Sequence, residues 1–106
     1  MSETVGILPE NIQSRIFTVR GLQVMLDEDL AVLYGVETKR INEQVKRNIE
    51  RFPREFCFQL TASDAEILRS QNATSSWGGR RYMPYVFTEQ GVTMLSAVLK
   101  AKPPFK

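Results

Sequence analysis

The chain has 106 residues, of which 42% are hydrophobic and 25% are charged, a composition typical of one globular domain rather than a disordered segment. Its formal net charge of +2 is too small to indicate nucleic-acid binding, and its single cysteine excludes an internal disulfide bond. We find no signal peptide and no apolar run near the roughly 20 residues of a membrane span, so we expect a soluble, cytoplasmic protein with no membrane contact.

The charges are unevenly distributed along the chain. Residues 1–38 contain two basic and six acidic side chains, a net charge of −4, whereas residues 39–106 contain twelve basic and six acidic ones, a net charge of +6. This asymmetry allows one positive face on a nearly neutral protein.

The first predicted element is a β-hairpin. Residues 1–11 show no sustained hydrophobic period, and we expect a flexible lead-in before a domain that spans residues 12–100. From Ile16 to Leu26 the chain is rich in β-forming residues, interrupted by Arg20-Gly21. This pattern predicts two short strands around Gly21, although a bulge there would also explain it. Asp27 then follows as a candidate helix N-cap.

The segment from Asp29 to Asn48, DLAVLYGVETKRINEQVKRN, predicts two helices joined by a tight turn. Gly35 can adopt the left-handed conformation that ends a helix sharply, and Thr38 or Glu37 can cap the next helix. Ala31 is small enough for two crossing helices to approach closely. A helix-turn-helix of this kind is the usual means of reading the major groove of DNA.

The second of these helices is predicted to be amphipathic. At about 100° per residue, Ile41, Val45 and Ile49 share one apolar stripe. The remaining side chains face outward or lie on the flanks: Lys39, Arg40, Asn42, Glu43, Gln44, Lys46 and Arg47. Arginine suits guanine, asparagine and glutamine suit adenine, and lysine suits phosphate. We therefore expect base contacts from Arg40, Asn42, Gln44 and Arg47 and phosphate contacts from Lys39 and Lys46. The alternative is a solvated surface helix.

After this helix the pattern predicts a strand and a short helix. Pro53 disfavours helical geometry at Phe52 and so ends the helix. Residues 55–60 (EFCFQL) alternate in part and are rich in aromatics, which favours a strand. Ser63 and Glu66 have the spacing of a capping box, which opens a helix that extends to about Ser70.

The last elements are a strand and a helix. Residues 80–87 (RRYMPYVF) predict a strand, which Pro84 favours at a sheet edge. Thr88 is placed to cap the final helix. The apolar face of that helix consists of Val92, Leu95, Val98 and Leu99.

The loop from Trp77 to Tyr82 (WGGRRY) is a second candidate contact surface. Its two glycines allow close backbone approach, and Arg80 and Arg81 supply positive charge beside aromatic rings. In a winged helix-turn-helix such a loop is the wing, which lies on phosphates or enters the minor groove. The alternative is a solvated loop with the tryptophan folded onto the core.

Other charged or reactive residues carry weaker signals. Arg51 and Arg54 could hold a phosphate, but pairing with their acidic neighbours Glu50 and Glu55 is favoured. Cys57 is expected to pack in the interior, because the chain has no histidine to generate its thiolate.

Catalytic and metal-binding patterns are lacking in the sequence. The acidic run from Asp27 to Asp29 fits the start of a helix better than a magnesium site. We find no phosphate-binding glycine loop, no zinc-ligand spacing and no catalytic triad. We therefore expect no metal, no cofactor and no enzymatic activity.

Two blocks of the sequence resemble a known family. VRGLQVMLDEDLAVLYGVETKRINEQVKRNIERFPREFCFQLT and LRSQNATSSWGGRRYMPYVFTEQGVTMLSAVLK are similar to the ORF-six-N domain, the KilA-N-related DNA-binding module of phages, prophages and large DNA viruses. The similarity spans Ile12 to Lys100. It implies a non-catalytic DNA-binding domain of antirepressor-like or regulatory proteins, with residues 38–48 and 78–81 facing the DNA. Such domains usually precede a longer region, whereas the tail here, residues 101–106, ends in KPPFK. We therefore expect a trimmed form of a longer protein or a natural remnant.

Together these patterns predict an α+β fold, a small winged helix-turn-helix-like domain with a short antiparallel β-sheet and about four helices. Its expected function is sequence-dependent binding of double-stranded DNA, with helix 38–48 in the major groove and loop 78–81 as the wing. The alternative is a protein-interaction or dimerisation module, in which the aromatic strands 56–60 and 82–87 bind a repressor or a second copy of the chain. A third option is RNA binding through exposed aromatic side chains.

Overall fold

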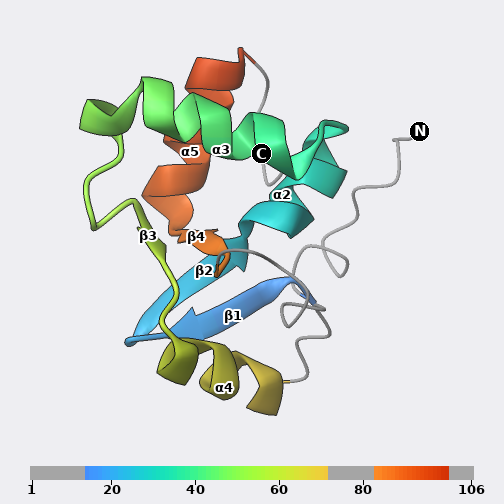
Figure 1. The fold of residues 1–106 in the computed structure, drawn as a ribbon, viewed down its shortest axis with the longest axis vertical. Helices are drawn as coiled ribbons and strands as arrows, with labels where there is room; N and C mark the ends of the chain where they lie inside the picture. The colour runs from blue at the N-terminus through green and yellow to red at the C-terminus, as the bar shows by residue number, and fades with distance from the viewer. Residues whose placement is uncertain (1–13, 72–82, 101–106) are drawn as a thin grey trace.

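A four-stranded antiparallel sheet separates helices on its two faces (Figure 1). The computed structural model describes residues 14–71 and 83–100, so the lead-in, the loop with Arg80 and Arg81, and the C-terminal tail lie outside the described residues. Within the described ranges the elements are β1 (Ile16–Val19), β2 (Leu22–Leu26), α2 (Asp27–Tyr34), α3 (Thr38–Arg47), a 3₁₀ turn (Ile49–Arg51), β3 (Cys57–Gln59), α4 (Ala62–Ser70), β4 (Tyr85–Phe87) and α5 (Glu89–Leu99). The predicted α+β class is confirmed. No helix of this part of the chain combines the length and hydropathy that a membrane crossing requires.

The sheet has the strand order β1-β2-β4-β3, and its side chains alternate between two apolar layers. One row across the sheet faces the layer that contains α2, α3 and α5, and it consists of Met25, Phe87 and Cys57. The next row faces α4, and it consists of Leu26, Val86 and Phe58. All six are buried. This period of two is the reason that so few strand residues can support helices on both sides.

The predicted hairpin is confirmed, and its loop is two residues long. Val19 pairs with Leu22, so Arg20 and Gly21 alone connect β1 to β2. Both loop residues have positive φ, 55° and 75°. Two consecutive left-handed residues match the right-handed twist of paired strands, and glycine adopts that conformation without steric cost.

The arginine in this turn also fastens the hairpin to α4. Its Nη2 atom lies 2.7 Å from Oδ2 of Asp64, and its guanidinium carbon lies 4.3 Å from the centre of the Phe58 ring. Asp64 is buried at 7% exposure, and this hydrogen-bonded pair lowers the pKa of its carboxyl group. These two side-chain contacts help to offset the cost of the left-handed backbone conformation of Arg20.

The capping box of α4 lies two residues earlier than predicted. Thr61, not Ser63, is the N-cap: its Oγ1 accepts from the Asp64 backbone N–H, and Asp64 Oδ2 accepts from the Thr61 N–H. The helix ends at Ser70 as expected. Arg20, in the β1–β2 turn, donates to the same carboxylate, so Asp64 serves both the capping box and a tertiary contact.

Two strand predictions need correction. Residues 55–60 were expected to form a strand, yet only Cys57–Gln59 do so. Of the strand expected over residues 80–87, Tyr85–Phe87 form a ladder, and residues 80–82 lie outside the described part of the chain. β4 is also central rather than at an edge, since it pairs with both β2 and β3. Pro84 is tolerated because it precedes the first ladder residue, and its carbonyl oxygen accepts from the Leu60 N–H at 3.0 Å.

The N-terminus of α5 packs against the chain just before β3. Thr88 caps the helix as predicted, because its Oγ1 accepts from the Gly91 N–H at 3.3 Å, and its hydroxyl donates to the Glu55 carbonyl at 2.7 Å. A Cβ atom on Gly91 would lie 1.8 Å from the Phe56 carbonyl oxygen. Glycine is therefore required here for close approach of two backbones.

We expect Gly91→Ala to destabilise the fold, because its methyl group collides with the backbone of Phe56. Relieving such an overlap typically costs about 1–3 kcal/mol. Gln90→Ala, at the exposed neighbouring position, is the matched control and should change the free energy of unfolding by only a few tenths. Urea denaturation measures both; equal midpoints for the two variants would contradict the packing described.

The contact between Arg20 and Asp64 should make stability depend on pH. The folded-state pKa of Asp64 lies below its ordinary value of 3.8, so the stabilisation is complete above that pH and is lost as pH falls toward the folded pKa. Asp64→Asn should therefore be less stable than wild type at pH 7, with the difference shrinking at acidic pH. Because Arg20 has a 41% exposed side chain, salt should reduce the effect. Glu66→Gln on the same helix serves as control, and a pH-independent difference for Asp64→Asn would refute the assignment.

Candidate nucleic-acid interface

The predicted turn between two helices is present. α2 ends at Gly35, which has a φ of 70°. Its N–H donates to the Val32 carbonyl at 3.2 Å, and the Val36 N–H donates to the Ala31 carbonyl at 2.9 Å. These bonds satisfy two of the carbonyls that a helix end leaves without partners. Three residues then connect α2 to α3, so the relative placement of the two helices is tightly restricted.

The inner face of α3 fixes the rotation of the helix about its axis. Ile41 and Val45 have 0% and 4% exposure and belong to the apolar layer shared with α2 and α5. Ile49, predicted to extend this stripe, is 60% exposed. The reason is that α3 ends at Arg47 and a 3₁₀ turn follows, which changes the direction in which later side chains point.

A hydrogen bond also ties the helix pair to α5. The hydroxyl groups of Tyr34, in the last turn of α2, and Ser96, in α5, are hydrogen-bonded to each other. Ser96 is buried, and burial raises the pKa of the Tyr34 hydroxyl group. Figure 1 shows α3 lying across α5 on the outer side of this helical layer.

The outer face of α3 is exposed and mostly basic. Its exposed residues are Lys39, Arg40, Glu43, Lys46 and Arg47. Lys39 and Lys46 are seven residues apart, as are Arg40 and Arg47, so each pair lies nearly in line along the helix with a spacing of about 10 Å. None of the four cations forms an ion pair within residues 14–71 and 83–100. We call these four side chains the basic face of α3.

Asn42 and Gln44 differ from the basic face. Both are half-buried. Asn42 Nδ2 donates to Oδ2 of Asp27 at 3.3 Å, and its Oδ1 atom is buried with no hydrogen-bond partner within the described ranges. The Asn42 amide thus faces the interior of the domain, while Gln44 remains on the flank of the helix.

Asp27 occupies a different position from the one predicted. The N-cap of α2 is Leu26, and Asp27 is the first helical residue, with 0% exposure. Its Oδ2 accepts from the Tyr85 backbone N–H at 3.2 Å as well as from Asn42. The buried carboxylate therefore connects α2 with both α3 and β4, which is a tertiary role rather than a local cap.

Cys57 packs in the same layer, as expected. Burial raises the pKa of its thiol to about 12, and the negative charge of Asp27 adds to the shift. The thiol is therefore protonated at neutral pH and is a poor nucleophile. Among the described residues, no cluster of His, Cys, Asp or Glu side chains has the arrangement of a metal site.

Two further arginines follow α3. Arg51 and Arg54 are exposed, and the ion pairs with Glu50 and Glu55 favoured from the sequence are not formed in the described structure. Both side chains extend the exposed positive charge beyond the C-terminal end of α3. The sequence-predicted residues Arg80 and Arg81 lie outside the described residues.

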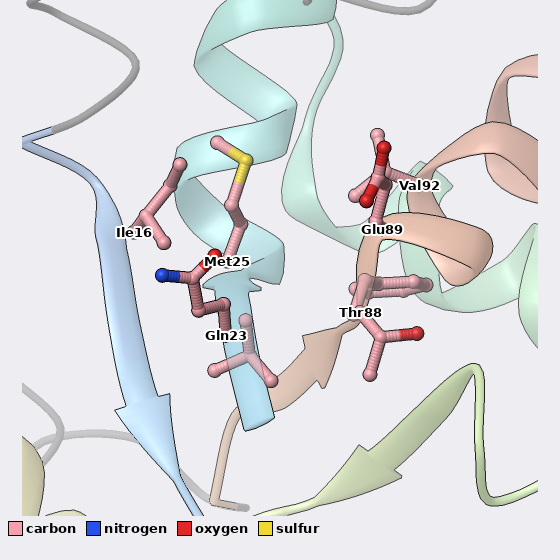
Figure 2. A pocket seen from close by; sticks show the side chains of 8 residues that line it. Ile16, Gln23, Met25, Thr88, Glu89 and Val92 are labelled. Carbon is pink, nitrogen blue, oxygen red and sulfur yellow. The ribbon is translucent and has the colours of Figure 1, made fainter. Parts of the chain in front are cut away.

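A shallow pocket of about 320 Å³ lies between the first hairpin and the start of α5 (Figure 2). Met25 and Ile16 face Glu89 and Val92 across it. Its walls are largely apolar, and the hydroxyl group of Thr88 is already used to cap α5. The lining does not bring together the acid, base and nucleophile that a catalytic site needs.

We expect Asn42→Ala to destabilise the domain, because it leaves the buried Asp27 carboxylate with one donor fewer. The loss of such a donor typically costs about 1–3 kcal/mol. Glu43→Ala, an exposed neighbour on the same helix, is the control and should unfold close to wild type. Urea denaturation at pH 7 compares them. If both variants have the same midpoint, the inward role of Asn42 is wrong.

Comparison with known proteins identifies the family. The model of the family described as the ORF6N domain matches residues 14–98, from the start of the first hairpin to the last turn of α5. Searches of curated proteins and of solved structures returned no significant match. Because the family model covers most of the 106 residues, the resemblance noted in the sequence is confirmed. The chain belongs to the ORF6N domain family, which is related to KilA-N.

Proposed function

We propose that this ORF6N domain binds double-stranded DNA by placing α3 in the major groove. The observation that carries the proposal is the basic face of α3, four exposed cations on one side of a helix whose other side is buried. Solvated surface helices usually intersperse opposite charges that pair with one another. Here the only acidic residue on the outer face is Glu43, and no ion pair neutralises the four cations within the described part of the chain.

The dimensions of the helix suit the groove. An α-helix with its side chains is about 10–12 Å across, and the major groove of B-DNA is about 12 Å wide. The lysines line one margin of the outer face and the arginines line the other, about 100° apart around the axis. A helix held with its apolar side inward would present the lysine margin to one phosphate wall of the groove and the arginine margin to the opposite side, from which the long arginine side chains reach base edges.

The roles of individual residues follow from this placement. Arg40 and Arg47 are proposed to donate to guanine, and Gln44, on the flank of the arginine margin, to contact adenine. Lys39 and Lys46 would contact phosphates. The contact of Asn42 with Asp27 supports a role for Asn42 in positioning α3 rather than in contacting a base.

The proposal includes a second contact surface. Residues 78–81, with Arg80 and Arg81, would form the wing of a winged helix-turn-helix and contact phosphates beside the helix. Arg51 and Arg54 extend the charge beyond the C-terminal end of α3. Together with the four cations of the basic face, these groups make up eight of the twelve basic side chains in residues 39–106.

The biological setting proposed is transcription regulation, as an antirepressor-like or related regulatory protein of a phage or prophage. Membership of the ORF6N family supports it, since the resemblance implied a non-catalytic regulatory module. We accordingly propose no enzymatic activity and no cofactor.

The alternative, a module whose aromatic strands bind a protein partner, has less support. Phe58 and Phe87, which belong to those strands, are 8% and 0% exposed and fill the cores of the domain itself. Dimer formation on DNA remains compatible with the proposal, because a single helix-turn-helix often needs a second copy for affinity. Light scattering with and without duplex distinguishes monomer from dimer.

Arg40→Ala and Arg47→Ala should weaken binding to a selected duplex by about 5- to 150-fold, the range of one good base contact. Lys46→Ala should weaken binding to all duplexes alike, and it should reduce the steepness of log affinity against log salt by about one, the value of one phosphate contact. Fluorescence anisotropy with labelled duplexes measures both.

The matched control is Arg69→Ala, which removes an exposed cation from α4, against the opposite face of the sheet. It should leave affinity nearly unchanged. If Arg69→Ala lost as much affinity as the α3 variants, the loss would be due to net charge alone and not to the position of the cation. Failure of the wild type to bind any duplex at low salt would refute the proposed function.

A further inference from the structure

The one acidic side chain on the outer face of α3 is Glu43, and its position is central. The residues three and four positions before and after it are all cations: Lys39, Arg40, Lys46 and Arg47. By helix geometry Glu43 lies between the lysine margin and the arginine margin, about 50° from each. It is exposed and forms no ion pair within residues 14–71 and 83–100.

A carboxylate at this point is unfavourable for non-specific DNA binding. The phosphate backbone is negatively charged, so a glutamate on the surface that approaches it reduces attraction for every duplex alike. Its cost is offset only where the carboxylate finds a hydrogen-bond donor. With the margins against the groove walls, the central side chain points to the floor of the groove, where base edges lie.

The chemistry of base edges selects one donor. A carboxylate only accepts hydrogen bonds. Guanine presents N7 and O6 acceptors and thymine presents an O4 acceptor, so both repel it. Adenine presents its N6 donor beside the N7 acceptor, whereas cytosine presents the N4 amino donor without an acceptor in the major groove. Cytosine is thus the base whose edge suits a lone carboxylate best.

We propose that Glu43 is a specificity-determining residue, which selects cytosine near the centre of the DNA site by accepting a hydrogen bond from its N4 amino group. The inference rests on the proposed function, because it requires α3 to lie in the major groove. Glu43 would favour duplexes with cytosine at this position and disfavour duplexes with guanine or thymine there. The four surrounding cations supply attraction for any sequence, and Glu43 makes that attraction conditional on the base beneath it.

Selection from a random duplex library tests the proposal, using wild type, Glu43→Gln and Glu43→Ala in parallel. Wild type should enrich cytosine at one central position, with about tenfold or greater preference over other bases in competition binding. Glu43→Gln should change that preference toward adenine, because an amide can bond both N6 and N7. Glu43→Ala should lose the preference, keep the enrichment at other positions and bind random duplex more tightly.

Glu66→Gln, an exposed glutamate on α4, is the control and should select the same site as wild type. Retention of the same base preference at every position by Glu43→Ala and Glu43→Gln would overturn the inference while leaving DNA binding intact. Failure of wild type to enrich any duplex would instead overturn the proposed function, and this inference with it.

Discussion

The rotational setting of α3 is the constraint on which the surface of this domain depends. Each residue of a helix is turned about 100° from the last, so a slip by one position would bury a cation and expose an apolar side chain. Ile41 and Val45 prevent this slip through apolar burial. Asn42 adds a directional contact, because its amide reaches the buried Asp27 carboxylate only when the helix is in one orientation.

The supports of α3 come from segments far apart in the chain. Asp27 belongs to α2 but accepts from Tyr85 in β4, and Tyr34 is hydrogen-bonded to Ser96 in α5. The sheet also supports this helical layer, because the central strand β4 lies between β2 and β3 and its Phe87 side chain packs in the layer of α2, α3 and α5. A substitution in the sheet could therefore change the orientation of the basic face without changing any of its four cations.

Sequence patterns correctly predicted the local structure where a single residue type determines the backbone conformation. Gly35 was predicted to end a helix because glycine tolerates positive φ, and the β-rich segments on either side of Arg20-Gly21 predicted a hairpin, with a bulge as the alternative. Thr88 was predicted as a cap because its hydroxyl group satisfies a nearby N–H. Residue spacing also placed the basic face correctly, since Ile41 and Val45 define its opposite side.

Predictions were wrong where partners lie far away in sequence. Asp27 was expected to cap a helix, but its observed partners are 15 and 58 residues distant. The capping box of α4 was placed two residues too late, and its observed carboxylate, Asp64, also accepts from Arg20, 44 residues away. Ile49 was expected in the apolar stripe, yet α3 ends at Arg47 and Ile49 begins a 3₁₀ turn. Such contacts depend on strand order and helix endings, which local spacing does not encode.

The central claim, that the basic face of α3 is the surface that contacts duplex DNA, is tested most directly by NMR titration of the ¹⁵N-labelled domain with a short duplex at low salt. We predict chemical-shift changes concentrated on the outer residues of α3, including Arg40, Glu43 and Arg47, with α4 little affected. Changes confined to α4 and the β1–β2 hairpin, with α3 unperturbed at saturation, would contradict the account.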